Sequence, residues 1–240
     1  VFGYHVKEPS RYGVVEFEFE GGISRVGSTR AHLEEDLGKN FHFDRDSGID
    51  FNRAGVPLLE IVTEPEIRSP EQAQAFLNAL KDIVIYGGVS DFDMEKGMAR
   101  CDVNISVRPL GQEELNPRRE IKNMNSFSGV RRALNYEIPH QIQQMESGET
   151  IRQGTVRWND DAGITESMRS KEDAHDYRYF PEPDLMPFEP TDEWLAEVRA
   201  RVVELPLARK RRFMADYELP EGDADVFVQN VPLGGELETV

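Results

Sequence analysis

The chain contains almost no cysteine. Cys101 is the single cysteine among 240 residues, so no internal disulfide and no zinc site built from several thiolates can form. No uninterrupted apolar run is long enough to span a bilayer, and the first residues lack the pattern of a signal peptide. These absences predict a protein of the reducing cytoplasm that does not enter a membrane.

Positive charge is also scarce. The chain has 28 Lys and Arg residues against 45 Asp and Glu residues, which gives a formal net charge of −17. Such a surface repels a phosphate backbone, so nonspecific nucleic-acid binding is disfavoured and only a local basic site stays open. The acidity suits a protein that collects divalent metal ions. It suits plain solubility equally well, and the charge alone does not choose between the two.

Hydrophobic periodicity predicts short strands with two packed helices, followed by a helical segment. We expect strands near residues 12–19, 23–36, 40–44, 57–64, 98–108 and 118–124, and helices near 70–86, 127–147, 191–204 and 207–217. The segment PEPDLMPFEP holds four prolines and is typical of a linker. The predicted fold class is α+β: an antiparallel-rich sheet domain over residues 1–188, then the start of a helical domain over 189–240.

The first long helix has the clearest local signals. Ser69, Pro70 and Gln72 are typical of an N-cap, a first-position proline and a capping-box partner, and Gly87–Gly88 ends the helix. Its apolar stripe consists of Ala73, Phe76, Leu77, Leu80, Ile83 and Val84. The stripe predicted for the second helix consists of Val130, Leu134, Ile138, Ile142 and Met145. Pro139 lies inside that second helix and is expected to kink it.

The segment ARCDVNISVRP, residues 99–109, alternates apolar and polar residues. Alternation with a period of two predicts a half-buried strand whose polar side chains share one face. These side chains are a carboxylate, an amide, a hydroxyl and a guanidinium, from Asp102, Asn104, Ser106 and Arg108. A merely solvated strand usually carries long charged residues and threonine. The row therefore raises the question of what binds to it.

Other predicted strands also place acids among apolar residues. Glu35 falls on the same face as Leu33, where a buried carboxylate would need a cation or a strong hydrogen-bond partner. Glu64 shares a face with apolar residues of PLLEIVTEP, and Glu120 and Lys122 share a face in REIKNMNSF. Each strand alone is explained more simply as a salt-bridged scaffold. Several of them in one small sheet favour a site where acids converge on metal ions.

A sheet that carries these acidic and basic side chains is suited to phosphoryl transfer. Mg²⁺ prefers one or two carboxylates together with phosphate and water oxygens, and phosphoryl transfer needs charge stabilisation more than covalent help. Lys122, Arg108 and Ser106 could face the phosphates. The sequence contains neither GxxxxGK[ST] nor GxGxxG, so the common nucleotide-binding folds are unsupported.

Five long motifs carry a family resemblance. HLEEDLGK, DFNRAGVPLLEIVTEPEIRSPEQA, MEKGMARCDVNISVRP, EIKNMNSF and SMRSKEDAHDYRYFPEPDL occur in the order expected of one family. Together they resemble the B subunit of aspartyl/glutamyl-tRNA amidotransferase, GatB, from about Thr29 to Asp225. The resemblance implies a cradle-shaped antiparallel sheet with helices, followed by a helical domain.

The implied activity belongs to an ATP-dependent ligase. In that family, ATP and Mg²⁺ are used to phosphorylate the side-chain carboxylate of Glu-tRNA(Gln) or Asp-tRNA(Asn). Ammonia from the partner amidase, which is the A subunit, then displaces the phosphate; a small C subunit makes up the heterotrimer. By motif position, the resemblance assigns the catalytic and metal-binding roles to Glu35, Asp102 and Glu120. Neighbours with an expected nucleotide-binding role are Glu64, Asn104, Ser106, Arg108 and Lys122. We expect the carboxylates of Glu35 and Asp102 to face each other across the sheet.

The sequence also departs from the family. The family begins with a Glu-Val-His segment that supplies part of the metal site, and many members carry cysteine pairs for zinc; neither is present here, and the final VFVQNVPLGGELETV differs as well. We therefore expect a chain truncated at both ends. The alternative function is a non-catalytic fragment that only binds partner subunits or nucleotide. The first 18 residues, VFGYHVKEPSRYGVVEFE, look more like an inner segment of glucose-1-phosphate thymidylyltransferases.

Two further segments have two explanations each. SMRSKEDAHDYRYFPEPD, residues 167–184, combines aromatic and cationic residues typical of a surface for RNA ends with acids typical of an internal salt-bridged network. The family resemblance favours a place near the tRNA acceptor end. ARKRR, residues 208–212, is the densest basic run, and we expect it to be a solvated helix face rather than a tRNA contact.

Overall fold

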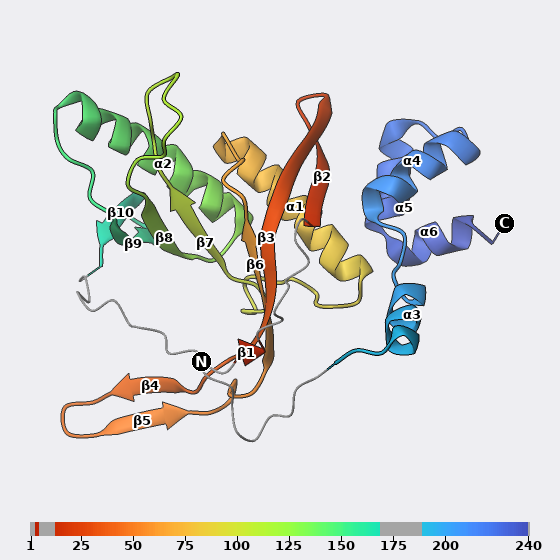
Figure 1. The fold of residues 1–240 in the computed structure, drawn as a ribbon, viewed down its shortest axis with the longest axis horizontal. Coiled ribbons are helices and arrows are strands. Elements are labelled where there is room, and N and C mark those ends of the chain that lie inside the picture. Colours follow the sequence, from red (N-terminus) through yellow and green to blue (C-terminus); the bar gives the residue numbers. More distant parts are fainter. Residues whose placement is uncertain (1–2, 5–12, 169–188, 240) are drawn as a thin grey trace.

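The computed structural model describes residues 3–4, 13–168 and 189–239. This part of the chain forms two β-sheets and a separate β-hairpin, with helices packed against the sheets (Figure 1). The first sheet has the order β1-β3-β2, with β6 also paired to β3, and all of its strand pairs are antiparallel. Its strands are β1 (Gly3–Tyr4), β2 (Gly13–Phe19), β3 (Gly22–Glu35) and β6 (Pro57–Thr63).

The second sheet has the order β10-β9-β8-β7. Its pairs are antiparallel except for β8 and β9, which run parallel. Its strands are β7 (Cys101–Ile105), β8 (Arg119–Met124), β9 (Gly154–Asn159) and β10 (Ile164–Ser167). Between β3 and β6 in the chain, β4 (Lys39–His42) and β5 (Ser47–Asp50) form the separate hairpin, which extends away from both strands (Figure 1).

Helix α1 (Pro70–Tyr86) begins and ends where its local signals predict. The Ser69 hydroxyl accepts a hydrogen bond from the backbone N–H of Gln72, and the Gln72 side chain accepts one from the backbone N–H of Arg68. Gly87 caps the other end. The buried stripe is confirmed apart from Ile83, and it consists of Ala73, Phe76, Leu77, Leu80 and Val84.

Helix α2 (Phe127–Glu146) runs unbroken through the exposed Pro139. Its buried face consists of Gly129, Val130, Ala133, Leu134, Glu137 and Gln141. Ile142, expected in the stripe, is 40% exposed, so the predicted stripe is wrong at that end. The carboxylate of Glu137 is fully buried because Arg119 Nη1 donates to its Oε1 at 2.9 Å and Thr165 Oγ1 donates to its Oε2 at 2.7 Å.

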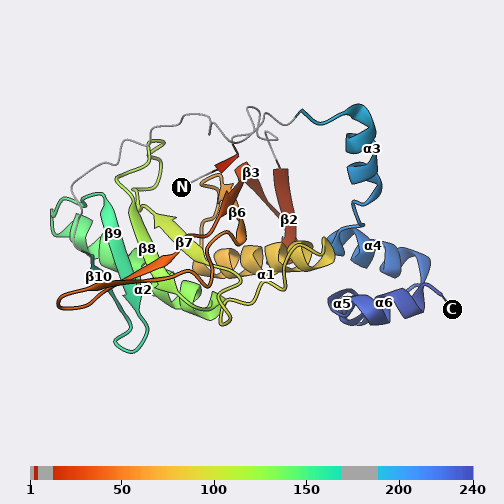
Figure 2. The same ribbon diagram turned by 90° about the horizontal axis from the view of Figure 1, so that it is seen from below.

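The two long helices lie side by side on one side of the sheets (Figure 2). The core fills the space between them and the sheets, and its most buried members include Phe17, Val26, Phe76, Ile121, Val130 and Trp158. Phe17 of β2 meets Phe76 of α1 edge to face, with ring centroids 6.0 Å apart. Among the residues that the structure describes, no helix packs on the opposite face of the second sheet, and that face carries the candidate site.

Three C-terminal helices form a smaller packed group near the end of α1 (Figure 2). They are α4 (Pro206–Asp216), α5 (Glu221–Gln229) and α6 (Val231–Leu237), and α3 (Asp192–Ala200), which has no buried residue, precedes them. Phe213 of α4 is fully buried against Ala224 and Val228. The Tyr86 hydroxyl at the end of α1 donates to the carbonyl of Val228 at 2.6 Å, which joins this group to the sheet-bearing part.

The basic run ARKRR is only partly a solvated helix face, because Arg211 is exposed while Arg209 and Lys210 are buried. Lys210 is only 5% exposed in its side chain, and its ammonium contacts carboxylates of Glu18, Glu221 and Asp225. Arg209 donates to Glu238 at 2.6 Å. The expectation is wrong for these two residues, because acids from β2, from α5 and from the end of the chain converge on α4 and neutralise cations that the isolated helix would expose.

The α+β class with antiparallel-rich sheets is confirmed. The last predicted strand before residue 110 is shorter than expected, because β7 stops at Ile105. The elements that the periodicity missed are β1, β5, β9, β10, α5 and α6. The segment 169–184 lies outside the described residues, so its two explanations both stand. In the described part of the chain, no helix combines the length and apolar character needed to cross a membrane.

Candidate functional site

The polar row of ARCDVNISVRP is shorter than the alternation predicts. Within β7, Asp102 and Asn104 are exposed while the residues between them turn inward. Ser106 and Arg108 follow the end of the strand. The Arg108 guanidinium donates to the carbonyl of Glu113, so it holds the loop after β7. The structure therefore keeps two of the four predicted side chains on the open face of the strand.

Strand β8 completes the row with Glu120 and Lys122. The Lys122 Nζ lies 2.9 Å from Asp102 Oδ2 and 3.2 Å from Glu120 Oε1, so two carboxylates share one ammonium. Partial burial disfavours the charged form of Lys122, but the hydrogen bonds and charges of Asp102 and Glu120 outweigh it, and the pKa of Lys122 lies above its ordinary value. Asn104 pairs with Glu120 across the ladder. The structure thus brings four of the predicted site residues together.

The same face continues across β9 and β10. Thr155 Oγ1 donates to Glu120 Oε2 at 3.0 Å, and Arg157 forms an ion pair with Glu166 at 2.7 Å. The opposite face of these strands is the core, where Val156 and Trp158 are buried. Sequence reasoning missed Thr155, Arg157 and Glu166. The alternation of GTVRWN over residues 154–159 was the signal that could have found the first two.

Asp36 joins the two sheets. Its Oδ2 accepts hydrogen bonds from Arg53 Nε at 2.7 Å and from Arg100 Nη2 at 3.3 Å, and its Oδ1 accepts one from the backbone N–H of Leu37. The hydrogen bond from Arg53 outweighs partial desolvation and, with the Leu37 bond and the nearby arginine charges, lowers the pKa of Asp36 below its ordinary value. Arg100 directly precedes β7, so this carboxylate links the end of β3 to the start of the polar row.

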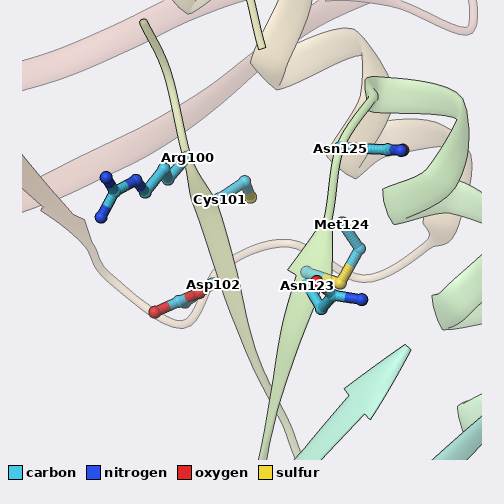
Figure 3. A pocket seen from close by; sticks show the side chains of 6 residues that line it. All are labelled: Arg100, Cys101, Asp102, Asn123, Met124 and Asn125. Carbon is cyan, nitrogen blue, oxygen red and sulfur yellow. The ribbon is translucent and has the colours of Figure 1, made fainter. Parts of the chain in front are cut away.

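A pocket of about 210 Å³ opens at this junction (Figure 3). Arg100 and Asp102 project from one side of the strand and Cys101 from the other, with Asn123 and Asn125 on the neighbouring segment (Figure 3). Burial, with a smaller contribution from Asp102, raises the pKa of the Cys101 thiol to about 12. Asn123 adopts a left-handed backbone with φ of 73°, a conformation that asparagine tolerates better than most residues. The pocket thus combines a guanidinium, a carboxylate and two amides.

Glu35 does not lie where the alternation suggested. It is exposed at the end of β3, on the same side as Leu33, which is itself 50% exposed. Its carboxylate has no hydrogen-bond or ion-pair partner among the residues that the structure describes. Glu35 belongs to the first sheet and Asp102 to the second, so the expectation that they face each other across one sheet is wrong. Glu64 is likewise tied to the first sheet, where Thr29 Oγ1 donates to it at 2.9 Å.

The less exposed face of β3 carries a different group of ligands. The side chains of His32, Glu34 and Glu60 offer ligand atoms that all lie within 4.8 Å of one another, the one such trio among the described residues. His32 Nδ1 is 3.0 Å from Glu34 Oε1, and Arg30 pairs with Glu60 at 3.0 Å. By alternation, Asp36 continues this face toward Arg100. A histidine with two carboxylates can hold a divalent cation, and sequence reasoning missed this trio because it assigned the inward face to the odd-numbered residues.

Exposed apolar side chains are frequent on β3, on β6 and in the segment between them that contains the β4–β5 hairpin, and Leu33 and Leu59 are cross-strand partners. This apolar surface consists of Leu33, Leu37, Phe41, Phe43, Ile49, Phe51, Val56 and Leu59. Phe43 and Phe51 are the most exposed of them, at 66% and 68%. Large exposed apolar patches on soluble proteins usually mark interaction sites.

Comparison with known proteins places these features in context. Residues 5–196 match the family described as the GatB/GatE catalytic domain. The chain is similar to the B subunit of the aspartyl/glutamyl-tRNA(Asn/Gln) amidotransferase of Caldanaerobacter subterraneus, with 52% identity over 227 residues that make up 94% of this chain and 48% of the relative. The proteins of the same name from Methylacidiphilum infernorum and Roseiflexus castenholzii are 52% and 53% identical, over 89% of this chain and 44% of each relative.

The chain spans about half the length of the curated relatives it matches. The family match begins at residue 5, so it takes in most of the first 18 residues, where we expected a likeness to nucleotidyltransferases.

Proposed function

The chain belongs to the GatB/GatE catalytic-domain family, and from this premise we propose that it activates the amino acid in a tRNA-dependent amidotransferase. ATP phosphorylates the side-chain carboxylate of Glu-tRNA(Gln) or Asp-tRNA(Asn) and leaves as ADP. Ammonia supplied by a partner amidase then attacks the acyl phosphate, releases phosphate and forms the amide. The proposed enzyme is an ATP- and Mg²⁺-dependent carbon–nitrogen ligase of the cytoplasm.

The observation that carries this proposal is the convergence of separate motifs on one junction. HLEEDLGK contributes Asp36, DFNRAG contributes Arg53, ARCDVN contributes Arg100 and Asp102, and EIKN contributes Lys122. Contacts of 2.7 to 3.3 Å join Asp36 to both arginines and Asp102 to Lys122. Charged groups of both signs on an open sheet face are what phosphoryl transfer requires, because it depends on positioning and charge stabilisation.

The residues present fit a divalent cation. Asp102 and Glu120 already share one cation, the ammonium of Lys122, and carboxylate oxygens are the ligands that Mg²⁺ prefers. We propose that these two acids hold Mg²⁺ and that Glu34, with His32, replaces the exposed Glu35 as the contribution of the HLEED motif. A bound Mg²⁺ would neutralise charge on the phosphate oxygens during transfer.

Lys122 and Asn104 have roles that follow from their positions. Lys122 is held by Asp102 and Glu120, and with Mg²⁺ bound to these two acids its ammonium would be available to a phosphate oxygen. Asn104 lies opposite Glu120 and can donate to the carboxylate that the metal polarises. Ser106, Arg108 and Glu64 are left out of the proposed site, since Ser106 and Arg108 follow the strand end and Glu64 binds Thr29.

The proposed partners are the aminoacyl-tRNA, the amidase (the A subunit) and the small C subunit. The apolar surface on β3, β6 and the hairpin supports a protein partner, because aromatic residues as exposed as Phe43 and Phe51 are typical of interface centres. Phe43→Ser together with Phe51→Ser should weaken complex formation with the amidase in size-exclusion chromatography. Equal complex formation would remove this surface from the proposal.

Reconstitution tests the function. The chain is mixed with the A and C subunits, ATP, Mg²⁺, glutamine and either Glu-tRNA(Gln) or Asp-tRNA(Asn), and the amidated aminoacyl-tRNA is quantified. Formation of glutaminyl- or asparaginyl-tRNA that depends on ATP supports the proposal, and the parallel assays identify the substrate. Formation of the complex without turnover supports the alternative, a chain that binds its partners or nucleotide only.

A further inference from the structure

Two arginines converge on one carboxylate at the junction of the sheets. Arg53 Nε and Arg100 Nη2 both donate to Asp36 Oδ2, at 2.7 and 3.3 Å. Asp36 thus faces two positive charges, in a chain whose net charge is −17. Each guanidinium has five N–H donors, and the contacts with the rest of the described chain use one donor of each. No described residue accepts from the remaining donors, which can bind an anion.

The arrangement is anchored from several directions. The Asp36 side chain is only 13% exposed, whereas those of Arg53 and Arg100 are 42% and 68% exposed. The backbone of Asp36 also exchanges hydrogen bonds with the loop that carries Arg53, accepting from Gly55 N at 2.9 Å and donating to Val56 O at 2.8 Å. Asp36 therefore fixes the loop and both side chains, while the guanidinium groups stay accessible.

We propose that Arg53 and Arg100, positioned by Asp36, form a subsite for the terminal phosphates of a nucleoside triphosphate; this deepens the proposed function and rests on it. The fork of a guanidinium matches the spacing of phosphate oxygens and donates to two of them at once. The pocket of about 210 Å³ extends from Arg100 to Asp102. A phosphate held by the arginines therefore lies beside the carboxylate that we assign to the metal ion.

A nucleotide fits this site better than an RNA backbone. RNA contacts need cations spread over an open surface, whereas this protein is acidic overall and the two arginines meet at one carboxylate, Asp36. Proximity to a carboxylate is unfavourable for a phosphate alone, but it is favourable for a phosphate that arrives with Mg²⁺. Arg100 lines the pocket together with Asp102, and Asp36 holds Arg53 beside Arg100. This combination of arginines and an acid favours a metal-bound polyphosphate.

Calorimetric titration of the purified protein with inorganic tripolyphosphate and Mg²⁺ tests the subsite. Arg53→Gln and Arg100→Gln should each weaken binding about tenfold or more, since each removes charge-assisted hydrogen bonds. Arg25→Gln is the matched control, because Arg25 is an exposed arginine that also pairs with one acid, Glu16, on the β2–β3 hairpin. It should bind like the parent. Thermal melts of all variants identify any that fail to fold.

Asp36 is a positioning residue, and a cycle of variants tests that role. Asp36→Asn alone should weaken tripolyphosphate binding, because the arginines lose their common anchor. In the Arg53→Gln/Arg100→Gln background, Asp36→Asn should change binding no further. A purely structural role would lower affinity equally in both backgrounds and would overturn the positioning role.

Two results would overturn the subsite. One is a folded double arginine variant that binds tripolyphosphate like the parent. The other is a double variant that loses binding of deacylated tRNA but keeps tripolyphosphate, which would assign the arginines to the RNA backbone. The titration contains no tRNA and no partner protein, so its result does not depend on amidation. Amidation by an arginine variant with unchanged binding would refute the subsite and leave the proposed function intact.

Discussion

The substitution Asp102→Asn distinguishes a metal-binding role of Asp102 from a purely structural one. The substitution keeps the shape of the side chain and removes one negative charge. Asp102 and Lys122 are 47% and 40% exposed in their side chains, so their ion pair is well solvated. Solvated pairs contribute about 0.2–1 kcal/mol to the free energy of unfolding. For a chain of this length, 1 kcal/mol corresponds to a shift of about 2–4 °C in the melting temperature. We therefore expect a loss of at most about 4 °C.

The effect on Mg²⁺–ATP binding should be much larger. Asp102 supplies one of the two carboxylates that flank Lys122, and an amide oxygen is a weaker ligand for Mg²⁺ than a carboxylate. A hydrogen bond or ligand contact that involves a charge contributes about 1.5–3 kcal/mol. The dissociation constant should rise by roughly 10- to 100-fold. In the reconstituted complex, activation of the aminoacyl-tRNA should be lost while the partner amidase still hydrolyses glutamine.

The assay combines calorimetric titration with thermal melts. Asp160→Asn is the control for nucleotide affinity, because Asp160 also pairs with an exposed basic residue, Arg132, at 2.8 Å, with side-chain exposures of 42% and 48%. Since Asp160 also accepts a hydrogen bond from the buried Trp158 indole, this variant should lose at least as much stability as Asp102→Asn and show no change in nucleotide affinity. The metal-site argument is wrong if Asp102→Asn binds Mg²⁺–ATP like the parent and melts more than about 4 °C lower. In that case the strand is scaffold, with Lys122 as the ion-pair partner of Asp102.

Four further predictions address the fold and its titratable groups. Leu80→Asp should lower the free energy of unfolding by at least about 4 kcal/mol in a urea titration, because it places an unpaired charge in the core between α1 and the sheet; a parent-like transition would refute that packing. The pKa of Asp36 is lowered below 3.8, first of all by its hydrogen bond from Arg53, so its stabilisation is present above pH 3.8 and is lost as the pH falls through the depressed value. Melts should show Asp36→Asn to be less stable than the parent at pH 7, with a difference that shrinks as the pH falls below 3.8; a difference that does not shrink would contradict this. Because the pKa of Cys101 is raised to about 12, iodoacetamide at pH 8 should label the native protein more slowly than the urea-unfolded protein, and faster native labelling would refute a neutral thiol. Lys210→Met should lower the free energy of unfolding by about 2–3 kcal/mol, because it leaves three partly exposed acids without their shared cation. An unchanged urea midpoint would show that this contact does not hold the C-terminal helices to β2.

Local signals made some elements predictable. The predicted ends of helix α1 are both confirmed, because Ser69 and Gly87 act within one turn of the positions they cap. The apolar stripe of the helix can be recognised from its own residues alone. The alternation of β7 and β8 correctly gave the face shared by Asp102, Asn104, Glu120 and Lys122. Each of these inferences depends on residues that are close in the sequence.

Other predictions failed because they depended on contacts between residues far apart in the sequence. Glu137 is fully buried in α2 although nothing near it in sequence offers a cation, because Arg119 comes from β8 and Thr165 from β10. Lys210 is buried in the same way by acids from β2 and the α5 region. A helix seen alone assigns both residues to the solvated face. Their burial depends on which distant strands and helices pack against them. The helical periodicity of the sequence, 3.6 residues per turn, does not contain this information.

The wrong prediction for Glu35 in the HLEED motif has a different cause. A period of two shows that Glu35 shares a face with Leu33, but it does not show which of the two faces of the strand is inward. The usual assumption places the apolar face inside. In β3 the reverse holds, because Leu33 is half exposed while His32 and Glu34 lie on the less exposed side. Asp36 continues that side to Arg100. The inversion moves the proposed chemistry by one residue in each direction, from Glu35 to the metal-ligand candidate Glu34 and to Asp36, which holds the arginines. It also leaves the outer apolar face for a partner to cover, so one choice of face determines both the proposed site and the proposed interface.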